Sequence, residues 1–198
     1  MNTKPVNRRH EKTKEKILDT AIKIIIKEGT EKLTLRYLAN KIDYSHAALY
    51  KFFKNKDELL EEIRSEVFIK LAGYTLKDVT PEMKINEYLM STGTNIIEFA
   101  LKYPELYMII FDPKIKASGI EEGLSNPLFG VILERIEESY RTGDLKLPEN
   151  STTIAFAFQN MIMLHGIIMI KLTFLRDPSS GFLDLGRNIL KSFYNSSI

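Results

Sequence analysis

Small, aromatic and basic side chains alternate closely in residues 44–60, YSHAALYKFFKNKDELL. Ala47 and Ala48 stand where the helix of a protein core would carry leucines, so a helix backbone could come close to another molecule there. Tyr50 and Lys51 follow, and their hydroxyl and ammonium groups can donate hydrogen bonds to phosphate oxygens. These residue types predict noncovalent recognition of a polyanion, with a helix entering a groove about 12 Å wide.

The sequence offers little for catalysis or metal binding. It contains no Gly-x-Ser-x-Gly elbow, no phosphate-holding glycine loop and no His-Glu-x-x-His motif. Its three histidines stand far apart, at positions 10, 46 and 165, and it has no cysteine. We therefore predict a protein that is not an enzyme and holds no metal or cofactor. His46 is either a base or phosphate contact or an exposed side chain without a role.

Charge is distributed unevenly along the chain. Residues 1–56 contain 14 Lys and Arg against 6 Asp and Glu, a net charge of +8, whereas residues 57–198 contain 14 against 20, a net charge of −6. A basic front joined to an acidic body is typical of a polyanion-binding module attached to another domain. A solvated basic tail with ordinary helix surfaces is the alternative. The basic N-terminus leads to no isolated apolar segment, so we expect no export signal and a cytoplasmic protein.

Helical patterns surround the stretch of residues 44–60. A first helix is predicted from Glu11 to the stop at Gly29, with one apolar face made by Ile17, Ala21, Ile24 and Ile25. Thr34 is placed to cap a second helix through Ile42, and Ser45 a third through Phe53. Asn55 can cap a fourth helix from about Lys56 to Leu76.

The two short helices, 34–42 and 45–53, are joined by a tight turn, which is the pattern of a helix-turn-helix. Leu49, Phe52 and Phe53 have the spacing of an anchoring face. We expect that face to pack on the first two helices, while Ala47 and Ala48 face a groove.

The block LTLRYLANKIDYSHAALYKFFKNKDELL resembles the DNA-binding domain of the TetR family of transcriptional regulators. The positions that match the family pattern are Thr34, Ala39, Ser45, Leu49, Tyr50, Phe53, Lys56 and Leu59. The resemblance implies phosphate contacts from Thr34, Tyr50 and Lys56. It implies closer contacts from Ser45, His46, Ala47, Ala48 and Lys51, and Arg36 joins these candidates.

Two positions depart from the family pattern. Asp43 and Tyr44 replace the usual Gly-Val of the turn, and Asp is one of the few residues that tolerates a left-handed backbone. Ala47 and Ala48 replace a frequent Gly-Thr, which removes a phosphate-binding hydroxyl but leaves methyl groups that can contact thymine. The DNA sequence that the protein reads therefore cannot be copied from a relative.

The rest of the chain also follows helical patterns, so we predict an all-α fold. The candidate helices are 82–103, 104–112, 128–142, 152–175 and 179–194, with 113–127 as a loop. We expect an N-terminal helix-turn-helix DNA-binding domain in residues 1–56 and a helical-bundle domain for effector binding and dimerisation in residues 57–198. EFALKYPELYMIIF and LHGIIMIKL resemble one class of effector domain in this family, although Met161 stands where a tryptophan is frequent.

Residues 154–170 form a 17-residue segment without a formal charge. A membrane span is the alternative, but Gln159, Asn160 and His165 lie inside the segment, which favours burial in a bundle and at a dimer interface. The family resemblance implies a homodimer through this helix and the last one, around residues 183–194. A two-fold dimer would place two recognition helices roughly 34–36 Å apart and would read a palindromic operator.

Aromatic, methionine and polar side chains in the second part could line a ligand cavity. The candidates are Phe99, Tyr103, Tyr107, Phe111, Phe158, Asn160, Met161, His165 and Met169. The same spacing also suits an ordinary core, and His165 suits a core histidine. We expect a repressor released from double-stranded DNA by a small apolar or aromatic effector, with the fourth helix as a lever. The alternative is a helical carrier or enzyme whose basic front is only a tail.

Overall fold

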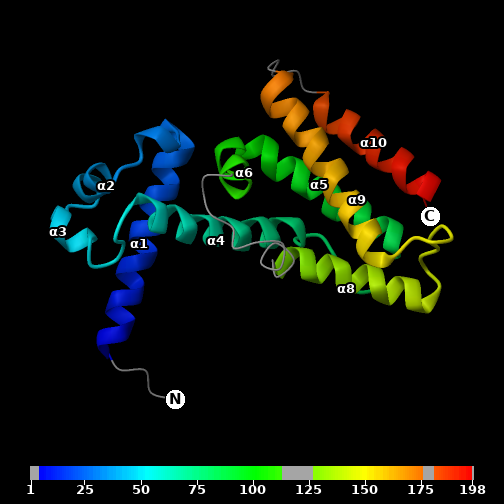
Figure 1. Ribbon diagram of the computed structural model, residues 1–198, viewed down its shortest axis with the longest axis horizontal. Coiled ribbons are helices and arrows are strands. Elements are labelled where there is room, and N and C mark those ends of the chain that lie inside the picture. Colours follow the sequence, from blue (N-terminus) through cyan, green and yellow to red (C-terminus); the bar gives the residue numbers. More distant parts are fainter. Residues whose placement is uncertain (1–4, 113–126, 176–180, 198) are drawn as a thin grey trace. The chain divides into compact units, whose positions relative to one another are not determined.

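The computed structural model describes residues 5–112, 127–175 and 181–197, and all regular elements among them are helices (Figure 1). The all-α prediction is therefore confirmed for this part of the chain. The described residues form two compact units. One contains those of 1–69 and 105–116, and the other those of 70–104 and 117–198. The functional division after residue 56 stays a prediction.

The first unit is built on α1 (Pro5–Glu28). Its predicted apolar face is correct, because Ile17, Ala21 and Ile25 are fully buried. The helix begins at Pro5 rather than at Glu11, and proline suits a first helical position because no N–H is needed there. It ends at Glu28, before Gly29, whose φ of 84° is a left-handed conformation suited to glycine, and η1 (Thr30–Lys32) follows.

Side-chain caps fix the two short helices, as the sequence predicts. The hydroxyl oxygen of Thr34 accepts a hydrogen bond from the Tyr37 backbone N–H at 3.1 Å, and α2 (Leu35–Lys41) begins there. The hydroxyl oxygen of Ser45 accepts from the Ala48 N–H at 3.1 Å and begins α3 (His46–Leu49).

The third helix is shorter than predicted, since α3 ends at Leu49 and not at Phe53. Beyond Leu49 the backbone tightens, because the Lys51 N–H donates to the Ala48 carbonyl and the Phe52 N–H donates to the Leu49 carbonyl. This tight turn buries Phe53 almost completely. The chain then enters α4 (Lys56–Thr75), where the Asn55 side chain accepts from the Glu58 N–H at 2.8 Å and confirms the predicted cap.

The apolar face predicted for α4 is buried, and it consists of Leu59, Leu60, Ile63, Val67 and Leu71. The helix contributes residues to both units, because the division falls between residues 69 and 70. Helix α6 (Pro104–Ile110) belongs to the first unit from Glu105 onwards.

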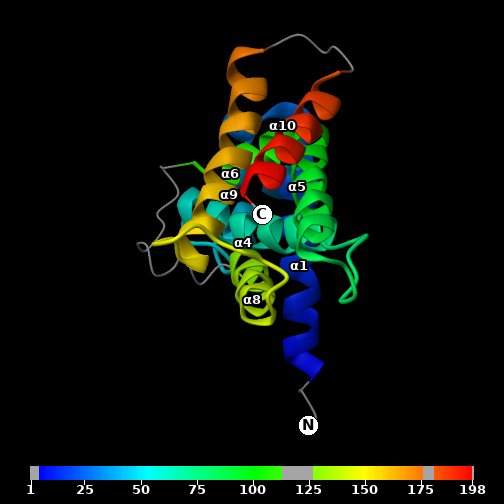
Figure 2. The ribbon, with the colours of Figure 1, turned by 90° about the vertical axis from the view of Figure 1, so that its right-hand side faces the viewer.

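The second unit is a bundle formed by α5 (Ile85–Lys102), α8 (Pro127–Thr142), α9 (Thr153–Met169) and α10 (Phe182–Ser197). Helix α5 packs against α8, α9 and α10, and Figure 2 shows α5, α9 and α10 side by side. The helix predicted for 152–175 ends in a π-helical segment, η2 (Ile170–Phe174). Residues 113–126 of the predicted loop lie outside the described residues.

A buried hydrogen-bond network joins α5, α9 and α10. The Tyr194 hydroxyl donates to Oδ1 of Asn160 at 2.7 Å, and the Leu89 carbonyl lies 3.4 Å from it. Asn160 Nδ2 donates to the Phe156 carbonyl at 3.2 Å. Burial raises the pKa of the Tyr194 hydroxyl far above its ordinary value, so this hydroxyl keeps its proton for donation.

The turn between α2 and α3 confirms the interpretation of Asp43, whose φ is 57°. We expect Asp43→Val to lower the free energy of unfolding by about 1–2 kcal/mol, because a β-branched residue is strained in this conformation. Asp43→Gly should not lower it, since glycine adopts positive φ freely. Urea unfolding of both variants gives the two values. An equal loss in both would show that the carboxylate, and not the backbone, matters.

Candidate nucleic-acid interface

The small-residue face of α3 is open to solvent. Ala47 is exposed and Ala48 is half-buried, whereas Leu49 on the opposite face is fully buried. Phe53 is also buried and anchors the turn after the helix. The helix therefore presents its backbone on one side and is held from the other, as groove docking requires.

Polar groups flank this open face. His46 and Lys51 are exposed, and Tyr50 is 49% exposed with its ring edge-on to His46 at a centroid distance of 4.8 Å. Phe52 packs on the first helix, as predicted. It is half-buried and stacks on the ring of His10 in α1, with centroids 4.5 Å apart.

The two capping hydroxyls could also donate hydrogen bonds to DNA phosphates. Thr34 and Ser45 are exposed, and each uses its oxygen as an acceptor for the cap. The hydroxyl hydrogen remains a donor that a phosphate oxygen could accept. Arg36 is exposed in the first turn of α2. The phosphate roles of these residues stay predictions.

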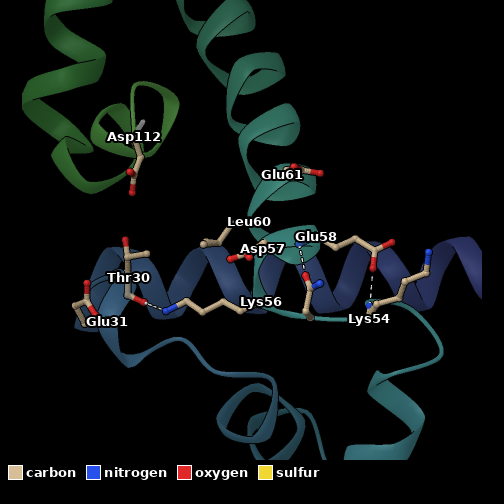
Figure 3. Close-up of a pocket in the computed structure, with 10 residues that line it drawn as sticks. Thr30, Glu31, Lys54, Lys56, Asp57, Glu58, Leu60, Glu61 and Asp112 are labelled. Atoms are coloured by element: carbon tan, nitrogen blue, oxygen red, sulfur yellow. Dashed lines mark hydrogen bonds between the residues drawn. The ribbon is translucent and has the colours of Figure 1, made fainter. Parts of the chain in front are cut away.

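Lys56 points into a cleft of the first unit (Figure 3), where its ammonium donates to the Thr30 carbonyl at 3.0 Å. The cleft has a volume of about 620 Å³. Carboxylates predominate in its lining, from Glu31, Asp57, Glu58, Glu61 and Asp112. Such a lining does not suit an anion. The hydrogen bond to Thr30 leaves at most two ammonium hydrogens of Lys56 for a phosphate.

Lys41, an exposed cation at the end of α2, is not among the predicted DNA contacts. Its ammonium lies 5.1 Å from the centre of the Tyr37 ring, and the interaction with Tyr37 raises the pKa of Lys41. The Tyr37 hydroxyl donates to Glu28 at 2.8 Å. The only signal for this arrangement in the sequence is the spacing of four residues between the ring and the lysine.

The predicted ligand residues are divided between the two units. Tyr107 and Phe111 belong to the first unit and pair with their ring centroids 5.1 Å apart, whereas the other seven belong to the second unit. Tyr107 is buried, and burial raises the pKa of its hydroxyl, while Phe111 is 40% exposed. Phe99 is buried, and its ring centroid lies 5.4 Å from that of the half-buried Tyr103.

Helix α9 divides its candidates between two faces. Asn160 is buried, and its amide serves the network with Tyr194, a structural role that the sequence analysis did not predict. Met161 is 39% exposed, and Phe158, which pairs with Phe129 at 5.2 Å, is half-buried. His165 and Met169 are also half-buried, and desolvation lowers the pKa of the histidine. Binding roles for these residues stay predictions.

A capped helix-turn-helix with an exposed small-residue face is typical of DNA-binding regulators, and here all regular elements among the described residues are helices. The sequence pattern of the bacterial regulatory proteins of the tetR family matches residues 17–63, which include α2 and α3. Residues 17–63 are therefore similar to the DNA-binding domain of the TetR family of transcriptional regulators. Members of this family bind DNA and small molecules and typically form homodimers.

Two curated relatives carry the same type of DNA-binding region. An uncharacterised HTH-type transcriptional regulator of Haemophilus influenzae is 28% identical over 92 residues, 46% of this chain and 49% of that protein. The nicotine-responsive transcriptional repressor HdnoR of Paenarthrobacter nicotinovorans is 34% identical over 58 residues, 29% of this chain and 30% of that protein. The chain thus spans half or less of the length of these relatives.

The fold of nearly the whole chain has solved counterparts. The structure of RolR in complex with the ligand resorcinol superposes with a TM-score of 0.69 at 10% identity. The superposition covers 94% of this chain and 89% of that chain. At this level of identity the likeness establishes a shared fold alone.

The position of Lys56 leads to a test of its phosphate role. We expect Lys56→Met to flatten the plot of log binding constant against log salt concentration by about one unit on any duplex, because one phosphate contact is lost. Fluorescence anisotropy with a random-sequence duplex at several salt concentrations gives the slope. Lys146→Met, an exposed lysine outside the helix-turn-helix, is the matched control. An unchanged slope would show that the Thr30 carbonyl is the main partner of Lys56.

Proposed function

We propose that the protein is a sequence-specific, ligand-responsive regulator that represses transcription from a palindromic operator. The observation that carries the proposal is the exposure of Ala47 on a helix anchored from behind by Leu49. Such a helix can approach base edges in the major groove without a rearrangement. The family consists of regulators rather than enzymes.

The contacts on DNA divide into two groups. Thr34, Tyr50 and Lys56 bind phosphates and set the position of the helix, which carries no sequence information by itself. His46 and Lys51 lie exposed beside the alanines and read base edges. The methyl groups of Ala47 and Ala48 favour thymine at the bases that they contact.

A small molecule releases the protein from DNA. HdnoR is named for its response to nicotine and RolR was solved with resorcinol, which supports a small effector here as well. The ligand shifts the population between conformations by the difference between its two affinities. Helix α4 has residues in both units and transmits the change as a lever.

The second unit binds a second copy of the chain. Several large apolar side chains of α9, η2 and α10 are exposed: Ile154, Met161, Ile162, Ile170, Phe174, Leu185 and Ile189. Together α9 and η2 form a helix, Thr153–Phe174, long and apolar enough to cross a membrane, with 33% of its most apolar window buried. The buried Asn160 network and the family favour a cytoplasmic homodimer over a membrane span.

Selection of bound sites from random duplexes tests the regulator proposal. We expect enriched sites with two inverted half-sites about 10 base pairs apart, or a multiple of this spacing, because a two-fold dimer presents two recognition helices. Binding should weaken steeply with salt, since phosphates are contacted. Absence of enrichment together with salt-insensitive binding would favour the helical carrier or enzyme.

A charged substitution on α9 tests the dimer. Ile162 is 66% exposed, and we expect Ile162→Glu to shift the protein from dimer to monomer, because two buried carboxylates would face each other or apolar side chains. Ile69→Glu is a matched control, since Ile69 is 64% exposed and lies on α4. Sedimentation equilibrium gives the mass of each variant. A dimer that survives Ile162→Glu would place the interface elsewhere.

A further inference from the structure

Three unpaired polar groups lie at the junction of α5 and α8. The Tyr88 hydroxyl, the Ser139 hydroxyl and Arg135 Nε are buried and have no hydrogen-bond partner in the described part of the chain. Tyr88 is 4% exposed and Ser139 is 1% exposed. Buried polar groups without partners are rare in proteins and call for a reason.

The three groups belong to one neighbourhood. The guanidinium carbon of Arg135 lies 5.7 Å from the centre of the Tyr88 ring. Ser139 follows Arg135 by four residues in α8, so both side chains leave the same face of that helix. The Leu145 N–H donates to the Ser139 carbonyl, and Asp144 accepts from the Ile85 N–H at 2.8 Å, which ties the end of α8 to the start of α5.

The rest of the Arg135 side chain is held in place. One terminal nitrogen donates to the Met83 carbonyl, and the other lies 3.5 Å from Glu138, whose side chain is 54% exposed. These contacts hold the guanidinium, and with it Nε, in a fixed position. Its cation has an acidic partner only on the solvent side in this described neighbourhood.

The chemistry of these groups defines what is missing. Arginine Nε can only donate a hydrogen bond, and the two hydroxyls can donate as well. An anionic group with two oxygens would offer acceptors for these donors, and its negative charge would balance the guanidinium. A carboxylate combines both properties, and its geometry matches that of a guanidinium.

We propose that Arg135, Tyr88 and Ser139 bind the carboxylate of a small organic acid, which is the effector. The proposal rests on the proposed function, because it names the chemical class of the ligand to which the regulator responds. The site differs from the nine candidates of the sequence analysis and adds a polar determinant to their apolar contacts.

The enclosed position of the groups explains how binding would signal. The three atoms are closed off from solvent in this conformation, so a carboxylate reaches them only when α5 and α8 separate locally. The ligand then prefers the opened conformation, and this difference in affinity is what shifts a population.

Thermal unfolding of the full-length protein with matched acids and amides tests the site. The probes are n-alkanoates from acetate to decanoate and benzoate, each compared with its primary amide. We expect at least one carboxylate to raise the Tm while its amide does not. Arg135→Met should abolish that shift, and Arg141→Met, an exposed arginine on the same helix, should keep it.

Removal of either hydroxyl gives a second signature. Tyr88→Phe and Ser139→Ala should each raise the Tm of the ligand-free protein by about 2–4 °C, because an unpaired buried group is removed. Each should also weaken carboxylate binding about tenfold by isothermal titration calorimetry. Tyr140→Phe, on an exposed tyrosine of α8, should do neither. These variants remain informative if Arg135→Met does not fold.

The outcomes separate this site from the proposed function. Failure of every carboxylate, equal shifts by acid and amide, or a shift that survives Arg135→Met would overturn the site. Duplex binding by the ligand-free protein, measured by anisotropy, would be unaffected by that failure. A carboxylate that binds at this site without weakening duplex affinity would support the site and contradict regulation through it.

Discussion

The burial of Leu49 and Phe53 is the interaction on which DNA recognition by this protein depends. Helix α3 has only four residues, and a helix of that length has no stability of its own. The Ser45 cap satisfies one of its backbone donors, but the burial of the apolar side chains fixes its orientation. Because Leu49 and Phe53 anchor the helix from one side, its alanine face is directed outward and needs no large side chain of its own.

In the second unit, a specific interaction must fix the orientation of α9, which is its most apolar helix. Apolar side chains occur around α9, and apolar contacts alone do not select one face. The Tyr194 hydrogen bond to Asn160 selects the face that points toward α10 and α5. Helices α10 and α5 also approach each other closely, since a Cβ at Gly186 would stand 2.9 Å from Ile97 Cδ1. The opposite face of α9 is then left apolar and exposed.

The sequence predicted local features well and long-range ones poorly. Caps at Thr34 and Ser45 depend on residues three positions away, so the sequence is sufficient to find them. The early end of α3 depends on the burial of Phe53, which propensity does not contain. The partners of Lys56 and Asn160 lie 26 and 34 residues away, so the structural roles of these side chains could not be inferred before the fold was known.

Apolar and polar groups differ in how they could let a ligand control the protein. An apolar ligand body that packs equally well in two conformations shifts neither, however tightly it binds. A change from 1% to 99% of one state requires about 5.5 kcal/mol of difference in binding free energy. Polar groups that are closed and unpaired in one state and paired in the other supply such a difference directly, since pairing cancels a desolvation cost. Buried hydroxyls such as those of Tyr88 and Ser139 are therefore better placed to carry a signal than the aromatic rings, which would mainly set affinity.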